Sequence, residues 1–335
     1  MNKKTRLIFF LIGLTIFVYL VAEFGLNNII INIGKIEWWF LPIVAVWGIV
    51  YIFNSLAWYI ILNGKKNSIK FIDILSVSIS GFAINYITPF INLGGEPYRV
   101  MALKESVGIH NSVSSVILYR MIHILGSFFF WFTGVIIVAL LFPLSPEFRI
   151  ALFIVSAVLI FLIWFFFSRH KKGIFKSILN IFSKFDFLSK INEKLTKRKK
   201  TLLLIDEQIT DLYLNRKTAF YFALLSEYGG RIIGSFEFYF ILIAVGINAS
   251  IIQAFFINAG SSIIMNVLFF IPFELGTREG SLYLVIESLG FTAGVGIFIA
   301  IVNRIRELFW ILIGLLLIQI KGKIVAEKKD ILDYV

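Results

Sequence analysis

The chain has 335 residues, of which 59% are hydrophobic, and its mean hydropathy of +0.89 excludes an ordinary soluble protein. The composition predicts an all-α polytopic integral membrane protein. The formal net charge of +12 indicates cytoplasmic loops facing anionic lipid rather than a nucleic-acid partner, and the absence of cysteine excludes disulfides and iron–sulfur sites.

Apolar runs follow one another along the chain, and a membrane span needs about 20 such residues. The first run, 7–24, follows three basic residues and precedes no small-residue cleavage site, so we expect a retained helix rather than a signal peptide. About six to eight transmembrane helices are expected from the whole set. The later runs are 38–62, 71–92, 113–142, 150–167, 218–246, 251–271, 281–289 and 291–320.

Lys and Arg in the loops predict the orientation, because cytoplasmic loops are enriched in them. The N-terminus and the loop 63–70 are basic and are predicted to be cytoplasmic. Segment 168–217 has 13 Lys and Arg against 5 Asp and Glu, and we expect it inside, as we do the basic tail 321–335. The sequence thus predicts a multi-pass plasma or inner membrane protein with both termini in the cytoplasm.

Two expected crossings, 113–142 and 150–167, lie between the loop after run 71–92 and the cytoplasmic segment 168–217, so that loop must also be cytoplasmic. Because loop 63–70 is cytoplasmic too, run 71–92 must enter and leave on the same face, as a re-entrant hairpin. Gly81, Asn85 and Pro89 provide the breaks that such a turn needs. A single crossing after residue 248 would make 251–289 a second hairpin, entered from the outside, although three crossings satisfy parity equally well. Two hairpins entered from opposite faces suggest an inverted repeat.

A polar cluster follows the first hairpin. Two glycines allow the backbone to approach a ligand closely, and Arg99 offers a forked set of donors that matches phosphate. A Gly-Gly turn with a local ion pair explains the cluster equally well. The candidate binding residues here are Asn85, Thr88, Pro89, Gly94, Gly95, Glu96 and Arg99.

The second cluster lies between two apolar runs and again combines a helix breaker, a glycine turn, an Arg and a Glu. Its candidate residues are Gly276, Arg278 and Glu279, after Pro272 and Glu274. A simple polar loop is the alternative, but two matching clusters weaken both alternatives. We expect Glu96, Arg99, Arg278 and Glu279 to line a common polar cavity.

Other charges fall within the apolar runs, where they are expensive. We expect structural pairs between Glu227 and Arg231, four residues apart, and between Arg304 and Glu307, three apart. Arg120 is a further candidate binding residue, because it has no acid nearby in sequence and needs a partner from elsewhere in the protein or from a ligand.

Several chemistries are not indicated. The three histidines have no metal-ligand spacing. The sequence has no P-loop, dinucleotide-binding glycine pattern or nucleophile elbow. We therefore expect no metal, no cofactor and no catalytic residue.

The two hairpin motifs give the sequence a recognisable pattern. Asn85-x-x-Thr88-Pro89 with Gly94-Gly95-Glu96-Pro97-x-Arg99, and Pro272 with Leu275-Gly276-x-Arg278-Glu279-Gly280, resemble the lysylphosphatidylglycerol synthase transmembrane region, or flippase-like, family. Family members often have Pro-Gly-Gly where this chain has Pro272-Phe273-Glu274. The resemblance implies one flippase-like domain over 1–335, with helical halves 1–167 and 218–320, a basic cytoplasmic segment 168–217 and a cytoplasmic tail 321–335.

The resemblance implies translocation of a phospholipid or polyprenyl-linked lipid between leaflets. Larger members fuse this region to an aminoacyl-transferase domain, for which no residues remain here. The alternatives are a membrane subunit of a phosphatidylglycerol lysyltransferase, lacking the soluble domain, and a non-transporting scaffold. We expect a membrane lipid with an anionic headgroup as the ligand, and a second copy of the chain or a separate lipid-modifying enzyme as further partners.

Overall fold

The computed structural model describes residues 26–62, 69–87, 94–141, 146–169, 199–269 and 276–332, together with residues 15, 271 and 274. The described regular structure is helical throughout. Almost all of the first predicted run, 7–24, lies outside the described residues, as do Thr88 and Pro89 of the first motif and Pro272 of the second.

Long helices form where the sequence has its long apolar runs. Among the described residues, three stretches are long and apolar enough to cross a membrane, namely Gly34–Leu62, Ile109–Leu141 and Arg149–Ser168. The helices 217–244 and 293–332 are also long, but they have buried charged side chains, such as Glu227 and Arg306, among their apolar residues. The long elements are α3 (Phe40–Leu62), α6 (Ile109–Leu141), α7 (Pro146–Arg169), α11 (Lys217–Ala244) and α14 (Ala293–Leu332), with α2 (Leu26–Ile36) and the 3₁₀ turn η1 (Glu37–Trp39) before α3.

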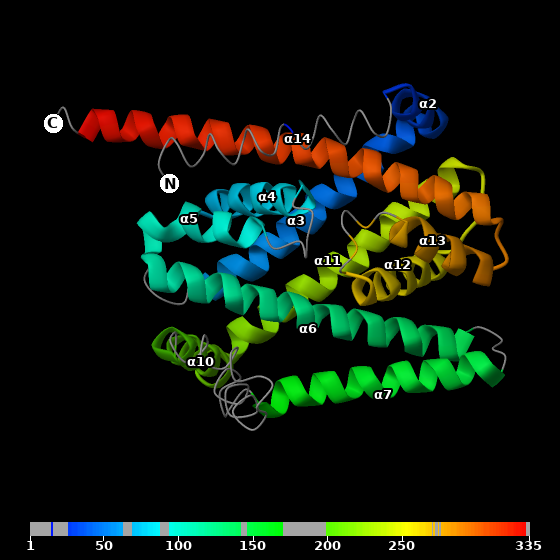
Figure 1. The fold of residues 1–335 in the computed structure, drawn as a ribbon, viewed down its shortest axis with the longest axis horizontal. Helices are drawn as coiled ribbons and strands as arrows, with labels where there is room; N and C mark the ends of the chain where they lie inside the picture. Colours follow the sequence, from blue (N-terminus) through cyan, green and yellow to red (C-terminus); the bar gives the residue numbers. More distant parts are fainter. Residues whose placement is uncertain are drawn as a thin grey trace.

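Short helices come in two antiparallel pairs. The first is α4 (Phe71–Ile87) with α5 (Gly95–Val107), and the second is α12 (Ile251–Val267) with α13 (Thr277–Ser288). In Figure 1 the pair α4 and α5 lies in the left half of the molecule and the pair α12 and α13 in the right half. At 1.5 Å per residue, helices of 17, 13, 17 and 12 residues are each shorter than the roughly 30 Å hydrocarbon core.

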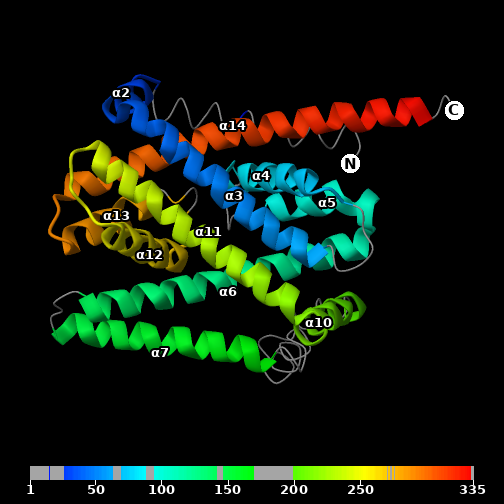
Figure 2. The same cartoon turned by 180° about the vertical axis from the view of Figure 1, so that it is seen from behind.

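The centre of the fold is the pair α3 and α11, which lie side by side along the same diagonal in Figures 1 and 2. Glycines let the two helices approach: a Cβ on Gly230 would lie 3.2 Å from Asn54 Oδ1 and from Phe53 Cβ. α14 packs along α4, where Ser80 Oγ donates to the carbonyl of Gly314 at 3.0 Å. The first hairpin pair is therefore held between α14 and α6.

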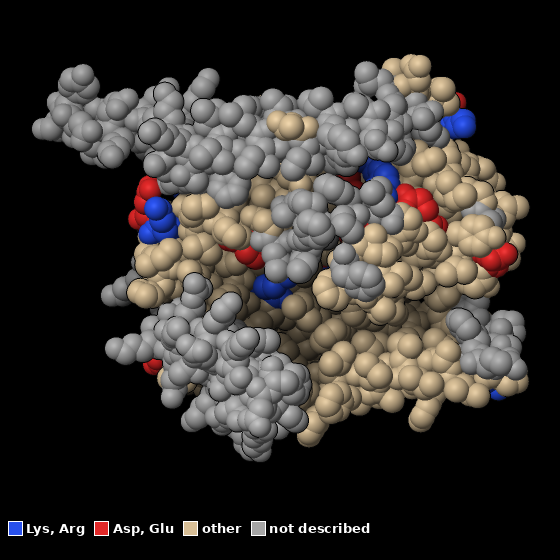
Figure 3. Space-filling view, in the orientation of Figure 1, with Lys and Arg blue, Asp and Glu red and all other residues tan. Residues whose placement is uncertain are grey.

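The outer surface of the described residues has many exposed apolar side chains, as expected of a protein in contact with lipid. Of the described helices, α7 packs mainly on α6 and exposes large apolar side chains, including Phe153 at 74% and Trp164 at 60% exposure. Figure 3 shows a mostly uncharged surface where it is described, with a small group of charged side chains near its middle. A soluble protein rarely exposes so large an apolar surface.

Three helices occur where the sequence predicted only loop or polar segment. α2 falls between the predicted runs 7–24 and 38–62, α5 falls between the predicted runs 71–92 and 113–142, and α10 (Lys199–Leu214) lies within the basic segment 168–217. α2 is too short to be recognised as a span, and α5 and α10 contain too many polar residues to be recognised as apolar runs. In α5 the residues at helical spacing, Arg99, Leu103 and Val107, are buried against the core.

Candidate functional site

The first motif forms the contact between α4 and α5. Asn85 of α4 accepts a hydrogen bond through Oδ1 from the backbone N–H of Gly95, at 2.6 Å. A Cβ on Gly95 would lie 2.0 Å from the carbonyl oxygen of Gly81, and one on Gly81 would lie 2.5 Å from Nε of Arg99. Only glycine fits at both positions, so the motif brings two backbones together and leaves room for the Arg99 side chain.

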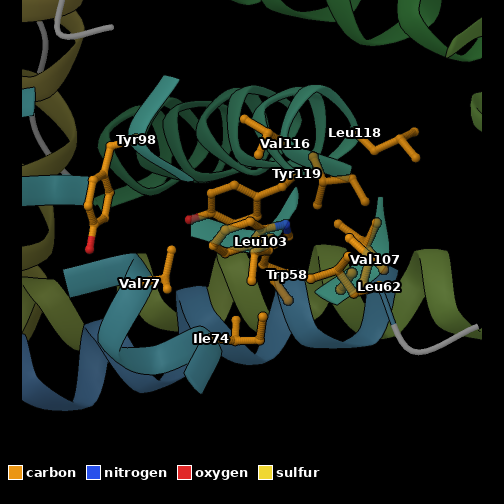
Figure 4. Packing of buried hydrophobic residues seen from close by; sticks show 14 of the residues in the cluster. Trp58, Leu62, Ile74, Val77, Tyr98, Leu103, Val107, Val116, Leu118 and Tyr119 are labelled. Carbon is orange, nitrogen blue, oxygen red and sulfur yellow. The ribbon is translucent and has the colours of Figure 1, made fainter. Parts of the chain in front are cut away.

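Arg99 is completely buried in an aromatic enclosure built from three helices. Its guanidinium carbon lies 4.5 Å from the ring centroid of Phe82, 5.5 Å from that of Tyr119 and 5.8 Å from that of Trp58. Figure 4 shows Trp58 and Tyr119 within the packed cluster of buried residues. The rings attract the cation through their faces but provide no strong hydrogen-bond acceptor.

A single carboxylate serves two arginines here. Oε1 of Glu96 lies 3.4 Å from Nη1 of Arg99 and 3.7 Å from Nη1 of Arg120. Nε and Nη2 of Arg99 are buried and have no acceptor among the described residues. The partner that Arg120 lacks in the local sequence thus comes from α5, and the resulting group of Glu96, Arg99 and Arg120, which we call the first charge cluster, is under-neutralised.

The second motif forms a cluster in which acids are plentiful. Arg278 lies 2.5 Å from Glu274 and 2.6 Å from Glu307 of α14. Arg304 of α14 lies 2.8 Å from Glu279, whose other oxygen accepts from the backbone N–H of Gly276. The expected pair of Arg304 with Glu307 is thus replaced by two pairs that join α13 to α14.

The most deeply buried ion pair among the described residues was not predicted from the sequence. Arg306 donates from Nε and Nη2 to the two carboxylate oxygens of Glu237, at 2.8 and 3.0 Å, and both side chains are at most 2% exposed. Trp47 donates to Glu237 and stacks under the Arg306 guanidinium, 3.8 Å from the ring centroid. The available signal was two charges within apolar runs, far apart in sequence.

Glu274 has the backbone conformation expected of glycine. Its φ is 53°, in the left-handed region, and Gly276 follows with a φ of 76°. This is the position where the family pattern often has glycine, so the carboxylate gained at Glu274 is held in a turn that suits glycine better. Its ion pair with Arg278 offsets part of that cost.

The structure thus brings Asn85, Gly95, Glu96, Arg99 and Arg120 together, with Gly94 at the start of α5, and places Gly276, Arg278 and Glu279 in the second cluster. Tyr86 of α4 lies near Glu307 and Arg278, and its neighbour Asn85 bonds to Gly95, so the end of α4 lies between the two clusters. A cavity shared by both clusters stays a prediction. Among the described residues, no three His, Asp or Glu side chains could hold a metal ion.

A third group adjoins the first cluster. His123 of α6 lies between Glu227 and Arg231 of α11, with Nδ1 2.7 Å from the Glu227 carboxylate and Nε2 3.1 Å from the Arg231 guanidinium. The two residues expected to pair along one helix face are therefore both bound to a histidine from another helix.

A family model described as the lysylphosphatidylglycerol synthase TM region matches residues 6–314, which is most of the chain. The chain belongs to this family. Membership agrees with the exposed apolar surface and the spanning helices, and it makes this a membrane protein of the lysylphosphatidylglycerol synthase or flippase-like type. No curated protein and no solved structure matches the chain.

Proposed function

We propose that this flippase-like family member binds the phosphate of an anionic lipid headgroup at the first charge cluster and moves the lipid between leaflets. The supporting observation is Arg99, a fully buried guanidinium with two nitrogens that lack an acceptor among the described residues. A buried charge with unsatisfied donors is costly, and a phosphate would supply the missing acceptors.

The charge balance favours the first cluster over the second as the anion site. The first has Arg99 and Arg120 against Glu96, a net charge of 2 − 1 = +1. The second cluster is joined to the Arg306–Glu237 pair at Glu307, which lies 3.9 Å from Arg306. Together they have Arg278, Arg304 and Arg306 against Glu237, Glu274, Glu279 and Glu307, a net charge of 3 − 4 = −1. An anion would be attracted to the first and repelled by the second.

The partly exposed side chain of Arg120 offers the headgroup a route to the buried Arg99. The side chain of Arg120 is 31% exposed, whereas that of Arg99 is 1% exposed. We infer that a headgroup meets Arg120 first and then displaces Glu96 from Arg99. The two short helix pairs would act as re-entrant hairpins whose tips meet near mid-membrane, with both termini of the chain in the cytoplasm of a plasma-membrane protein.

Translocation is measured with a fluorescent phosphatidylglycerol in phosphatidylcholine vesicles, in which an impermeant quencher reports the outer leaflet. Replacing Arg99 by Lys keeps the charge and loses the fork, so the protein-dependent rate should fall by at least about tenfold. Arg120→Lys should reduce it less, because that side chain is partly hydrated. Arg149→Lys, the same change at an exposed position, is the matched control.

Monodispersity before reconstitution confirms that each variant is folded. Wild-type vesicles that scramble lipid no faster than empty vesicles would refute translocation. A well-folded Arg99→Lys protein with the wild-type rate would show that Arg99 is structural and that the headgroup binds elsewhere.

A further inference from the structure

His123 is held in one tautomer by its two neighbours. The guanidinium of Arg231 can only donate, so Nε2 of His123, 3.1 Å away, must be the acceptor and has no proton. Nδ1 then has the ring proton and donates it to the Glu227 carboxylate at 2.7 Å. The geometry therefore indicates a neutral imidazole, in which Nε2 has no proton and accepts a hydrogen bond from the Arg231 guanidinium.

The side chain of His123 is partly exposed and lies among charged groups. The side chain of His123 is 23% exposed, while Glu227 is completely buried. Nε of Arg231 has no acceptor among the described residues, although Nη2 also donates to the backbone carbonyl of His123 at 3.0 Å. Arg231 is thus a cation with one unsatisfied donor beside a histidine that partly faces the surface.

Tyr119 joins this group to the first charge cluster. Its ring centroid lies 5.5 Å from the guanidinium carbon of Arg99 on one side and 6.0 Å from the ring centroid of His123 on the other. The titratable and charged groups around His123 come from three helices. They are Glu227 and Arg231 from α11, Tyr119 and Arg120 from α6, and Arg99 from α5.

We propose that Nε2 of His123 is a proton-binding site linked to the anion site, so that the protein takes up a proton when an anionic headgroup binds. The inference rests on the proposed function. A phosphate at Arg99 and Arg120 attracts the nearby Arg231 guanidinium, which then leaves Nε2. A proton from water takes its place, and the imidazolium stays paired with Glu227 through Nδ1.

The charges of the surrounding side chains favour binding of the proton and the anionic headgroup together. Without the proton, Arg99, Arg120 and Arg231 against Glu96 and Glu227 give 3 − 2 = +1. The proton raises this to +2, which strengthens binding of an anion, and linkage makes the effect reciprocal. Lipid should therefore bind more tightly at lower pH. Imidazole is the side chain that gains a proton in the physiological range.

Nitrogen-15 NMR of histidine-labelled protein in nanodiscs tests the linkage directly. The titration midpoint of His123 is compared in discs of phosphatidylcholine alone and in discs that also contain phosphatidylglycerol. We expect a rise of about one pH unit with the anionic lipid, since the phosphate stabilises the imidazolium through a poorly screened interaction. His123→Gln assigns the signal.

His110, exposed at the start of the same helix, is the internal control for the general effect of an anionic surface on local proton concentration. The excess shift of His123 over His110 should disappear in Arg99→Gln, and in Arg120→Gln if the first variant does not fold. A His123 that does not titrate between about pH 5 and 8, or that shifts no more than His110, overturns the proton site.

The vesicle assay separates the two proposals. Wild-type translocation with no excess shift of His123 would leave the proposed function intact and disprove the linkage. An excess shift in a protein that does not translocate lipid would establish linked proton and anion binding and disprove transport.

Discussion

Buried arginines have two kinds of surroundings in this molecule. Arg306 makes a bidentate pair with Glu237 and stacks on Trp47, so its charge is neutralised within the protein. Arg99 is just as buried but has three aromatic rings and a shared, distant carboxylate. The first arrangement suits a structural tie, and the second suits a site that waits for an anion.

The structural assignment of Arg306 predicts a stability effect. Glu237→Gln leaves the buried Arg306 guanidinium with only the more distant Glu307 carboxylate, 3.9 Å away, and should destabilise the protein by about 3–5 kcal/mol. Glu279→Gln breaks the more exposed pair with Arg304 and should cost no more than about 1 kcal/mol. The fraction that stays monodisperse after heating measures both. Equal losses for the two variants would contradict the distinction.

The two pairs of short helices, α4 with α5 and α12 with α13, define the architecture. Because Gly81 faces Arg99 and Asn85 faces Gly95, α5 runs back along α4. In the second pair Gly260 faces Val285, so α13 runs back along α12 in the same way. The outer ends of each pair are then expected at one membrane face, and the two pairs at opposite faces.

Single-cysteine labelling tests this topology against a clean background, because the chain has no cysteine. Cysteines at the exposed positions Lys70 and Lys104 should react only from the cytoplasmic side in intact cells. Cysteines at Ser250 and Ser288, also exposed, should react only from the outside. Labelling of positions 70 and 104 from opposite sides would show that the first pair crosses the membrane.

The long helices were predicted closely from the sequence because apolar runs are a strong local signal. The predicted run 113–142 corresponds to α6, and 218–246 to α11, with ends that differ by a few residues. α5 was not predicted as a helix because that segment has nearly equal numbers of polar and apolar residues, and its helical spacing becomes evident only once a buried face is known.

The candidate site was predictable in part for a similar reason. Glycine, Asn and Arg in one short motif indicated Gly95, Asn85 and Arg99. The partners of charges on different helices were not predictable, since nothing local relates Glu237 to Arg306 or His123 to Arg231. Within the second motif the local pattern indicated Arg278 but not its contact with Glu307.

The whole molecule combines an apolar exterior with a small charged interior. The first charge cluster has a net positive charge, the second a net negative charge, and the end of α4 lies between them. Such an interior can attract the polar part of a lipid whose chains remain in the bilayer. Identification of the lipid that the protein retains is thus informative about both binding and transport.

Native mass spectrometry of the purified protein tests the headgroup site most directly, because it detects the ligand itself and depends on no coupling or direction of transport. Wild-type protein and the Arg149→Lys control should retain one anionic phospholipid, and Arg99→Lys should lose it while staying folded. Retention of the same lipid by Arg99→Lys, or selective retention of a neutral lipid by the wild type, would contradict an anionic headgroup site at Arg99.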